Sequence, residues 1–158
     1  MDKKLNELGY AIIGAAFEVR KNLGRFMYEK TYERALQIEL SLRNIKCENQ
    51  VRIPINYKGV VISDAYKVDL LVEGVIPIEL KTLPEMGSTE LSQILSYLTF
   101  GNFQLGYLIN FRAEDFIAKP VPKSICLDKG IYRIAKSEIW EFFTNKCRYR
   151  SEKIPKNR

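Results

Sequence analysis

Residues 66–81 constrain the fold of this chain more than any other segment, because apolar residues alternate on both sides of a Glu73-Gly74 break. Alternation with a period of two is typical of β-strands, and Glu-Gly between two such runs is typical of a tight turn. A two-residue loop would turn one apolar row towards water. The pattern therefore predicts an antiparallel hairpin with a three-residue connection or a bulge.

The register of this hairpin follows from its two apolar rows. The rows pair residue by residue, Val72 with Ile76, Leu70 with Ile78 and Val68 with Leu80. This register places Asp69 opposite Glu79, and Lys81 lies two residues beyond Glu79 on the same face. We therefore expect two carboxylates and a lysine to share one face of a sheet.

Such a face needs a compensating charge, because directly opposed carboxylates repel each other. A divalent cation would supply it, and oxygen ligands suit Mg²⁺ or Mn²⁺. Lys81 could then stabilise developing phosphorane charge or orient an attacking water. The alternative is an exposed polar face with a simple ion pair, since Glu-x-Lys is common on strands.

The composition excludes several catalytic classes. The chain contains no histidine, which rules out His-based acid–base catalysis, Ser-His or Cys-His nucleophiles and most catalytic zinc sites. Three scattered cysteines, Cys47, Cys126 and Cys147, form no Cys-x-x-Cys motif and predict reduced thiols. We find no signal-peptide pattern and no membrane-spanning run, and we expect a cytoplasmic protein without a membrane partner.

Periodicity predicts the other elements of a single domain over residues 1–146, followed by a basic tail at 147–158. Helices are expected at residues 4–22, 28–44, 90–100 and 137–146, with Ser88 or Thr89 capping the third. Further strands are expected at residues 50–55, 60–63, 104–111, 116–121 and 131–134. A net charge of +6 favours polyanionic partners without identifying them.

Two helices carry further candidate site residues. Glu29 and Tyr32 are one turn apart, so both side chains can point the same way, although a glutamate in a first turn is also favoured by the helix dipole. Gln93 and Tyr97 are neighbours on one helical face and could contact a phosphate or a bound water. The alternative is a partly buried Tyr97 beside a solvated Gln93.

The order of these segments resembles the PD-(D/E)xK nuclease superfamily, and within it the small proteins named for a Gly-x-x-Glu-x-x-Tyr motif. The resemblance spans residues 8–120. It is carried by Leu23-Gly24, residues 29–36, Tyr57-Lys58-Gly59, residues 68–72 and 78–81, the Gln93/Tyr97 pair and residues 106–111. Two positions depart from that family: Phe26 stands at the leading glycine, and Arg20 stands where a histidine is frequent.

The resemblance implies a mixed central sheet flanked by helices, a restriction-endonuclease-like α/β core, here with an extra C-terminal helix. It implies that Asp69, Glu79 and the Leu80 carbonyl hold Mg²⁺ or Mn²⁺, and that Lys81 and Glu29 complete the catalytic set. Three further residues are then expected to orient the substrate or the side chains around it, Gln93, Tyr97 and Tyr32.

The expected function is a Mg²⁺-dependent nuclease in which water attacks a phosphodiester, with nucleic acid as its partner and DNA favoured over RNA. The alternative is a catalytically inactive module of the same fold that binds nucleic acid or another protein.

Overall fold

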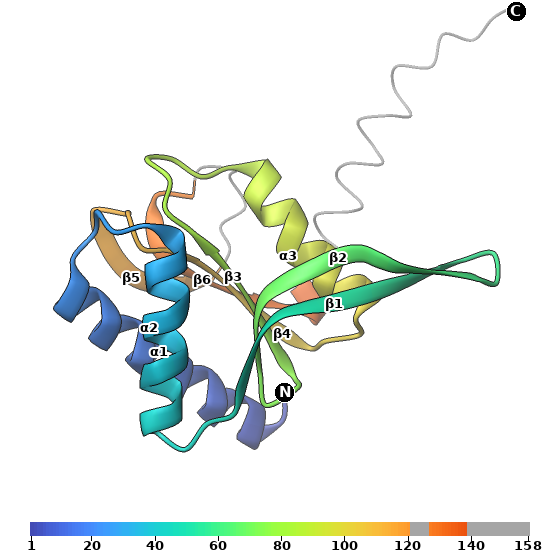
Figure 1. Ribbon diagram of the computed structural model, residues 1–158, viewed down its shortest axis with the longest axis horizontal. Coiled ribbons are helices and arrows are strands. Elements are labelled where there is room, and N and C mark those ends of the chain that lie inside the picture. The colour runs from blue at the N-terminus through green and yellow to red at the C-terminus, as the bar shows by residue number, and fades with distance from the viewer. Residues whose placement is uncertain (121–126, 139–158) are drawn as a thin grey trace, which may run out of the picture.

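A mixed sheet of six strands forms the centre of the computed structural model, which describes residues 1–120 and 127–138 (Figure 1). The strands are β1 (Cys47–Tyr57), β2 (Val60–Val72), β3 (Ile76–Lys81), β4 (Leu105–Asn110), β5 (Asp115–Pro120) and β6 (Lys129–Ala135). Their order across the sheet is β1-β2-β3-β4-β6-β5. The β3–β4 and β5–β6 pairs are parallel, and the other neighbours are antiparallel.

Helices cover both faces of the sheet. α1 (Lys3–Leu23) and α2 (Glu29–Leu42) share one core cluster with β3 and β4, whereas α3 (Ser88–Phe100) packs in a second cluster on the other side. Figure 1 shows α1 and α2 together on one side of the strands and α3 on the other. All six residues of β4 are buried, as expected for a strand covered on both faces. The predicted α/β core flanked by helices is confirmed.

The helix ends follow from local chemistry. The Asp2 carboxylate accepts a hydrogen bond from the Lys4 N–H at 3.1 Å and caps α1. At the other end, Gly24 has a φ of +71° and donates its N–H to the carbonyl of Arg20. The predicted cap of α3 is wrong, because the helix begins at Ser88 itself. Gly87 precedes it and donates its N–H to the Glu90 carboxylate at 2.8 Å.

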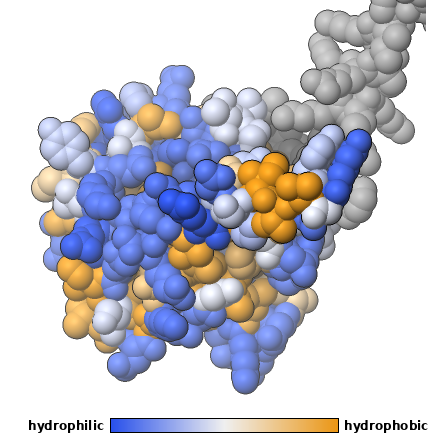
Figure 2. Space-filling view, turned by 45° about the vertical axis from the view of Figure 1, so that its right-hand side comes forward, coloured by the Kyte–Doolittle hydropathy of each residue, from blue (hydrophilic) through white to orange (hydrophobic). Residues whose placement is uncertain are grey.

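β1 and β2 extend beyond the rest of the sheet as a two-stranded arm (Figure 1). β2 is continuous, whereas the sequence predicted separate strands at 60–63 and from residue 66. A two-residue turn with positive φ at Lys58 and Gly59 closes the arm, as a right-twisted hairpin requires. Figure 2 shows an apolar patch on the side of the molecule that carries the arm. The exposed apolar residues of the arm are Tyr57, Val60, Val61 and Ile62.

The predicted three-residue connection of the β2–β3 hairpin is confirmed. Val72 pairs with Ile76 and Leu70 with Ile78, as the apolar rows required. The expected third pair, Val68 with Leu80, does not form. Val68 packs with α3, whereas Leu70 and Leu80 pack with α1 and α2. The alternation of β2 therefore changes phase at Asp69, where the facing residue Gln50 has a φ of +52° and interrupts the β1–β2 ladder.

The strands predicted at 116–121 and 131–134 correspond to β5 and β6. A short 3₁₀ helix, η1 (Lys136–Glu138), follows β6. The rest of the helix predicted at 137–146 and the basic tail at 147–158 lie outside the described residues. Within the described part of the chain, no helix is long and apolar enough to cross a membrane.

Candidate active site

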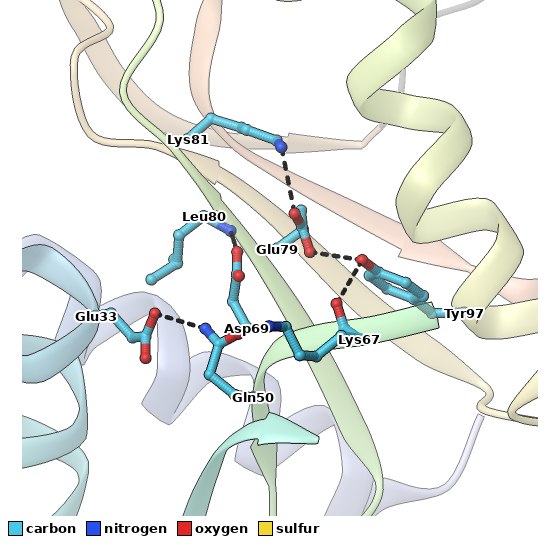
Figure 3. A network of polar contacts seen from close by, with 8 residues as sticks. All are labelled: Glu33, Gln50, Lys67, Asp69, Glu79, Leu80, Lys81 and Tyr97. Atoms are coloured by element: carbon cyan, nitrogen blue, oxygen red, sulfur yellow. Dashed lines mark hydrogen bonds and ion pairs between the residues drawn. The ribbon is translucent and has the colours of Figure 1, made fainter. Parts of the chain in front are cut away.

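The carboxylates of Asp69 and Glu79 converge where β2 and β3 separate (Figure 3). The β2–β3 ladder ends at the pair of Leu70 and Ile78. Beyond it, the backbone N–H of Leu80 donates to Oδ2 of Asp69 at 2.8 Å rather than to a strand carbonyl. This bond holds the Asp69 side chain over β3, the strand that carries Glu79 and Lys81.

Glu79 is the best-packed acid of the site, with only 3% of its surface exposed. Its Oε1 lies 3.3 Å from the ammonium nitrogen of Lys81, and its Oε2 lies 3.0 Å from the hydroxyl of Tyr97. That hydroxyl also lies 3.0 Å from the carbonyl oxygen of Lys67. A phenol has one proton, so Tyr97 donates to one of these acceptors at a time. Each oxygen of Glu79 thus faces one donor, Lys81 from the same strand β3 and Tyr97 from α3.

The two central carboxylates are held in an environment that disfavours their charge. Burial, with the Asp69 charge as the next cause, raises the pKa of Glu79 to about 7, although Lys81 and Tyr97 act in the opposite direction. Burial also raises the pKa of Asp69, against the hydrogen bond from Leu80. Raised carboxyl pKa values of this kind mark negative charge that the protein alone does not compensate.

The first turn of α2 brings a third acid to the site. Glu29 is half-buried, and its pKa is raised first by burial and then by the charge of Asp69, while Lys81 lowers it. Glu29 therefore lies within electrostatic reach of the central residues, as expected.

Tyr32, which was expected to orient the substrate or the side chains around it, contacts the loop before α2. Its hydroxyl donates to the carbonyl of Gly24 at 2.5 Å and accepts from the N–H of Met27 at 3.2 Å. Its ring stacks on Phe111 with the centroids 4.4 Å apart. The structure therefore places the Tyr32 hydroxyl on the loop between α1 and α2 and not beside the carboxylates.

The sequence reasoning missed Glu33 and Gln50. Glu33 is buried and accepts hydrogen bonds from Gln50 at 2.9 Å and from Asn49 at 3.3 Å. Its charge also raises the pKa of Asp69. One signal could have identified Glu33, because it follows Glu29 by four residues and so shares its helical face. No signal identified Gln50, whose side chain reaches Glu33 from a strand position with positive φ.

Gln93 and Tyr97, one turn apart on α3, have different surroundings. Tyr97 is buried, and its hydroxyl contacts Glu79, so it can orient that carboxylate. Gln93 is half-buried one helical turn earlier on α3, and the structure describes no hydrogen bond between it and the carboxylates.

The donor set suits a hard divalent cation. Asp69 and Glu79 offer carboxylate oxygens, the ligand type that Mg²⁺ and Mn²⁺ prefer, and burial raises the pKa of both carboxyl groups. Within residues 1–120 and 127–138, however, no three acidic, cysteine or histidine side chains are gathered closely enough to hold an ion together. Cys47 is no substitute, because burial raises its thiol pKa to about 12.

Comparison with known proteins gives one result. The family model described as the PD-(D/E)XK nuclease superfamily matches residues 6–120. No curated protein and no solved structure gives a significant match. The matched region contains every candidate residue named above and covers most of the chain. On this match, and on a mixed sheet flanked by helices, the chain belongs to the PD-(D/E)XK nuclease superfamily.

Proposed function

We propose that this protein is a Mg²⁺-dependent nuclease that hydrolyses phosphodiester bonds of nucleic acid. The observation that carries the proposal is the buried Glu79, which lies 3.3 Å from Lys81 and shares its environment with Asp69. A structural protein gains little from two buried carboxylates whose pKa values are raised, because their charge costs stability. A site for a cation and a phosphate explains why they are kept together.

In this proposal Asp69, Glu79 and the carbonyl of Leu80 hold the ion, with Glu29 as a further acidic partner. Bound Mg²⁺ would supply Lewis acidity and lower the pKa of water at the site. The N–H of Leu80 keeps the Asp69 carboxylate in place, and the hydroxyl of Tyr97 keeps that of Glu79 in place. These two bonds provide the orientation that a metal site takes from its surroundings.

Lys81 has the role of a mobile donor. In the structure its ammonium group is paired with Oε1 of Glu79. When that oxygen is engaged elsewhere, the ammonium can donate to the attacking water or to the charge that develops on the phosphate. Lys81 is 18% exposed in its side chain, which leaves it open to such a partner.

We further propose membership of the Gly-x-x-Glu-x-x-Tyr family, since Glu29 and Tyr32 keep that spacing. The nuclease superfamily supports a nucleic-acid substrate, and we propose DNA rather than RNA. A location in the cytoplasm stays a prediction.

Cleavage assays with labelled DNA and RNA of one sequence, single- and double-stranded, test this function. Wild-type protein is expected to cut with Mg²⁺ or Mn²⁺ and to be inactive in EDTA. Asp69→Asn and Glu79→Gln should each abolish cleavage, whereas Asp64→Asn, an exposed acid on the same strand β2, should retain it. The proposal is wrong if the wild type cuts none of these substrates, or if cleavage survives in both site variants.

One observation favours the alternative of an inactive binding module. Both Glu79 oxygens already have a partner, Lys81 for Oε1 and Tyr97 for Oε2, so the protein stabilises this carboxylate in part without an ion. Nucleic-acid binding that is as tight in EDTA as in Mg²⁺, and unchanged in Asp69→Asn, would support that alternative.

A further inference from the structure

Three arginines and one exposed phenylalanine form a cluster that takes no part in the proposed chemistry. We call it the arginine cluster, and its members are Arg20 at the end of α1, Arg25 and Phe26 in the loop of residues 24–28, and Arg112 after β4. The loop leads directly into Glu29. On the other side, the N–H of Phe111 donates to the carbonyl of Lys81 at 3.0 Å. The cluster therefore adjoins the candidate active site.

Phe26 is presented to solvent beside two cations. Its side chain is 74% exposed, although it stands on an ordered loop. The guanidinium carbon of Arg25 lies 4.9 Å from the ring centroid, and that of Arg112 lies 5.9 Å from it. An exposed ring with guanidinium groups at this distance has the chemistry of a stacking platform for a base with an adjacent anion site.

The cluster carries positive charge that the described residues do not fully compensate. Arg25 pairs with the exposed Glu114 at 3.5 Å. For Arg20 and Arg112 the structure describes no ion pair. Nη1 of Arg20 is buried without an acceptor, and its guanidinium lies 4.8 Å from the ring centroid of Phe116. Since hydrogen-bond donors of guanidinium groups favour phosphate oxygens, the partly exposed Arg25 and Arg112 fit a nucleotide phosphate.

The loop that carries Phe26 is held in place before any ligand binds. Nε of Arg25 donates to the carbonyl of Arg112 at 3.0 Å, which joins the loop to the end of β4. Tyr32 bonds the backbone of Gly24 and Met27 at the two ends of the turn. A platform fixed in this way loses little conformational entropy when it binds.

We propose that Phe26, Arg25 and Arg112 form a subsite for one unpaired nucleotide, whose base stacks on Phe26 and whose phosphate contacts the two guanidinium groups. The inference rests on the proposed function and specifies the form of nucleic acid that the site takes. In a duplex both faces of each base are covered by its neighbours, so a side chain stacks on a base only in a single strand or at an open end. The motif of the resembled family has glycine at the position of Phe26. The stacking residue is therefore a feature of this chain and not of that motif.

Anisotropy measurements in EDTA, with fluorescently labelled oligo-dT and a long duplex whose internal base pairs far outnumber its two ends, test the subsite without any cleavage. Phe26→Ala is expected to weaken oligo-dT binding about tenfold and duplex binding less than about twofold. In a plot of the logarithm of the oligo-dT binding constant against the logarithm of the salt concentration, Arg112→Gln should reduce the steepness of the slope by about 0.7. Tyr10→Ala is the matched control, because Tyr10 is 75% exposed on α1 and lies outside the cluster.

A second measurement reports stacking itself. An oligonucleotide that contains 2-aminopurine should lose fluorescence on binding to the wild type and to Tyr10→Ala but keep it with Phe26→Ala.

The subsite is overturned if the wild type binds no oligo-dT, if Phe26→Ala binds it as tightly as the wild type, or if Tyr10→Ala loses as much affinity. A peptide-binding role for the cluster would give one of these results. A wild type that binds oligo-dT through Phe26 but cuts nothing supports the subsite and removes the nuclease proposal. A wild type that cuts while Phe26→Ala binds normally removes the subsite alone.

Discussion

The hydroxyl of Tyr97 lies 3.0 Å from Oε2 of Glu79 and joins α3 to β3 in the interior of the protein. Tyr97 is almost fully buried, and the partners of its hydroxyl are Glu79 and the carbonyl of Lys67. We therefore predict that Tyr97 positions the carboxylate of Glu79. This contact ties the helix with the Gln-x-x-x-Tyr spacing to the strand with the Glu-x-Lys spacing.

Tyr97→Phe keeps the buried ring and removes the donor. The hydrogen bond from Tyr97 lowers the pKa of Glu79, so its loss should raise that pKa and move the pH midpoint of Mn²⁺ binding upwards. The free energy of unfolding should fall by about 1–2 kcal/mol, as expected for a lost hydrogen bond to a charged group. Metal titrations at several pH values and urea unfolding measure the two effects.

The control for that prediction is Tyr107→Phe, which removes another buried hydroxyl on β4. It should lower stability without moving the pH midpoint of metal binding. Equal pH midpoints for Tyr97→Phe and the wild type would show that Tyr97 does not act on Glu79.

Glu79 should make the metal-free protein less stable as pH rises. Its folded pKa, about 7, lies above the ordinary value of 4.5, so between these values the folded state binds a proton that the unfolded state has released. The free energy of unfolding should therefore fall by up to about 3 kcal/mol between pH 4.5 and pH 7. Urea unfolding in EDTA at pH 5 and pH 8 measures this loss.

Glu79→Gln should remove much of that pH dependence and make the protein more stable than the wild type at pH 8. Glu29 and Asp69 also have raised pKa values, so part of the dependence should remain in the variant. Asp64→Asn should behave like the wild type, because its carboxyl is exposed. Wild type and Glu79→Gln with parallel stability profiles would contradict the environment assigned to Glu79.

Tyr32→Phe should loosen the loop of residues 24–28 and leave the core packed. The substitution keeps the ring stacked on Phe111 but removes the bonds to Gly24 and Met27. Because the loop carries Phe26, hydrogen exchange of the Met27 amide should become faster, and stability should fall by about 1 kcal/mol. An unchanged exchange rate at Met27 would mean that other contacts hold the loop.

Much of the sheet could be predicted from hydrophobic alternation alone. The paired apolar rows required three residues between Val72 and Ile76, and the structure has them, with positive φ at Glu73 and Gly74. Register is strongly specified here because a one-residue slip would expose a complete apolar row. The continuous apolar run of β4 likewise indicated a strand buried on both faces.

The change of phase at Asp69 could not be predicted from alternation. It depends on Gln50, an ordinary residue type with a φ of +52°, in a strand that is far away in the sequence. The same irregularity directs Gln50 to Glu33, and for that reason this buried acid was missed. Long-range contacts of this kind leave no periodic signal in either strand.

The conformation of the loop before α2 could not be predicted from residue spacing either. Spacing placed Glu29 and Tyr32 on one side of a helix, which allowed both to point at the site. The Tyr32 hydroxyl turns instead to Gly24, because the preceding loop folds back over the start of α2. Only the folded loop shows that the charge of Asp69 acts on Glu29 whereas the hydroxyl of Tyr32 bonds the loop.

Isothermal titration calorimetry with Mn²⁺ at pH 8 tests the central claim most directly, since it asks whether Asp69 and Glu79 form an ion site. The wild type and Asp64→Asn are expected to bind, and Asp69→Asn and Glu79→Gln are each expected to lose binding. Wild-type binding should weaken at pH 6, where the carboxyl of Glu79 is largely protonated. Binding of equal strength in all four proteins, or no binding to the wild type, would contradict the account.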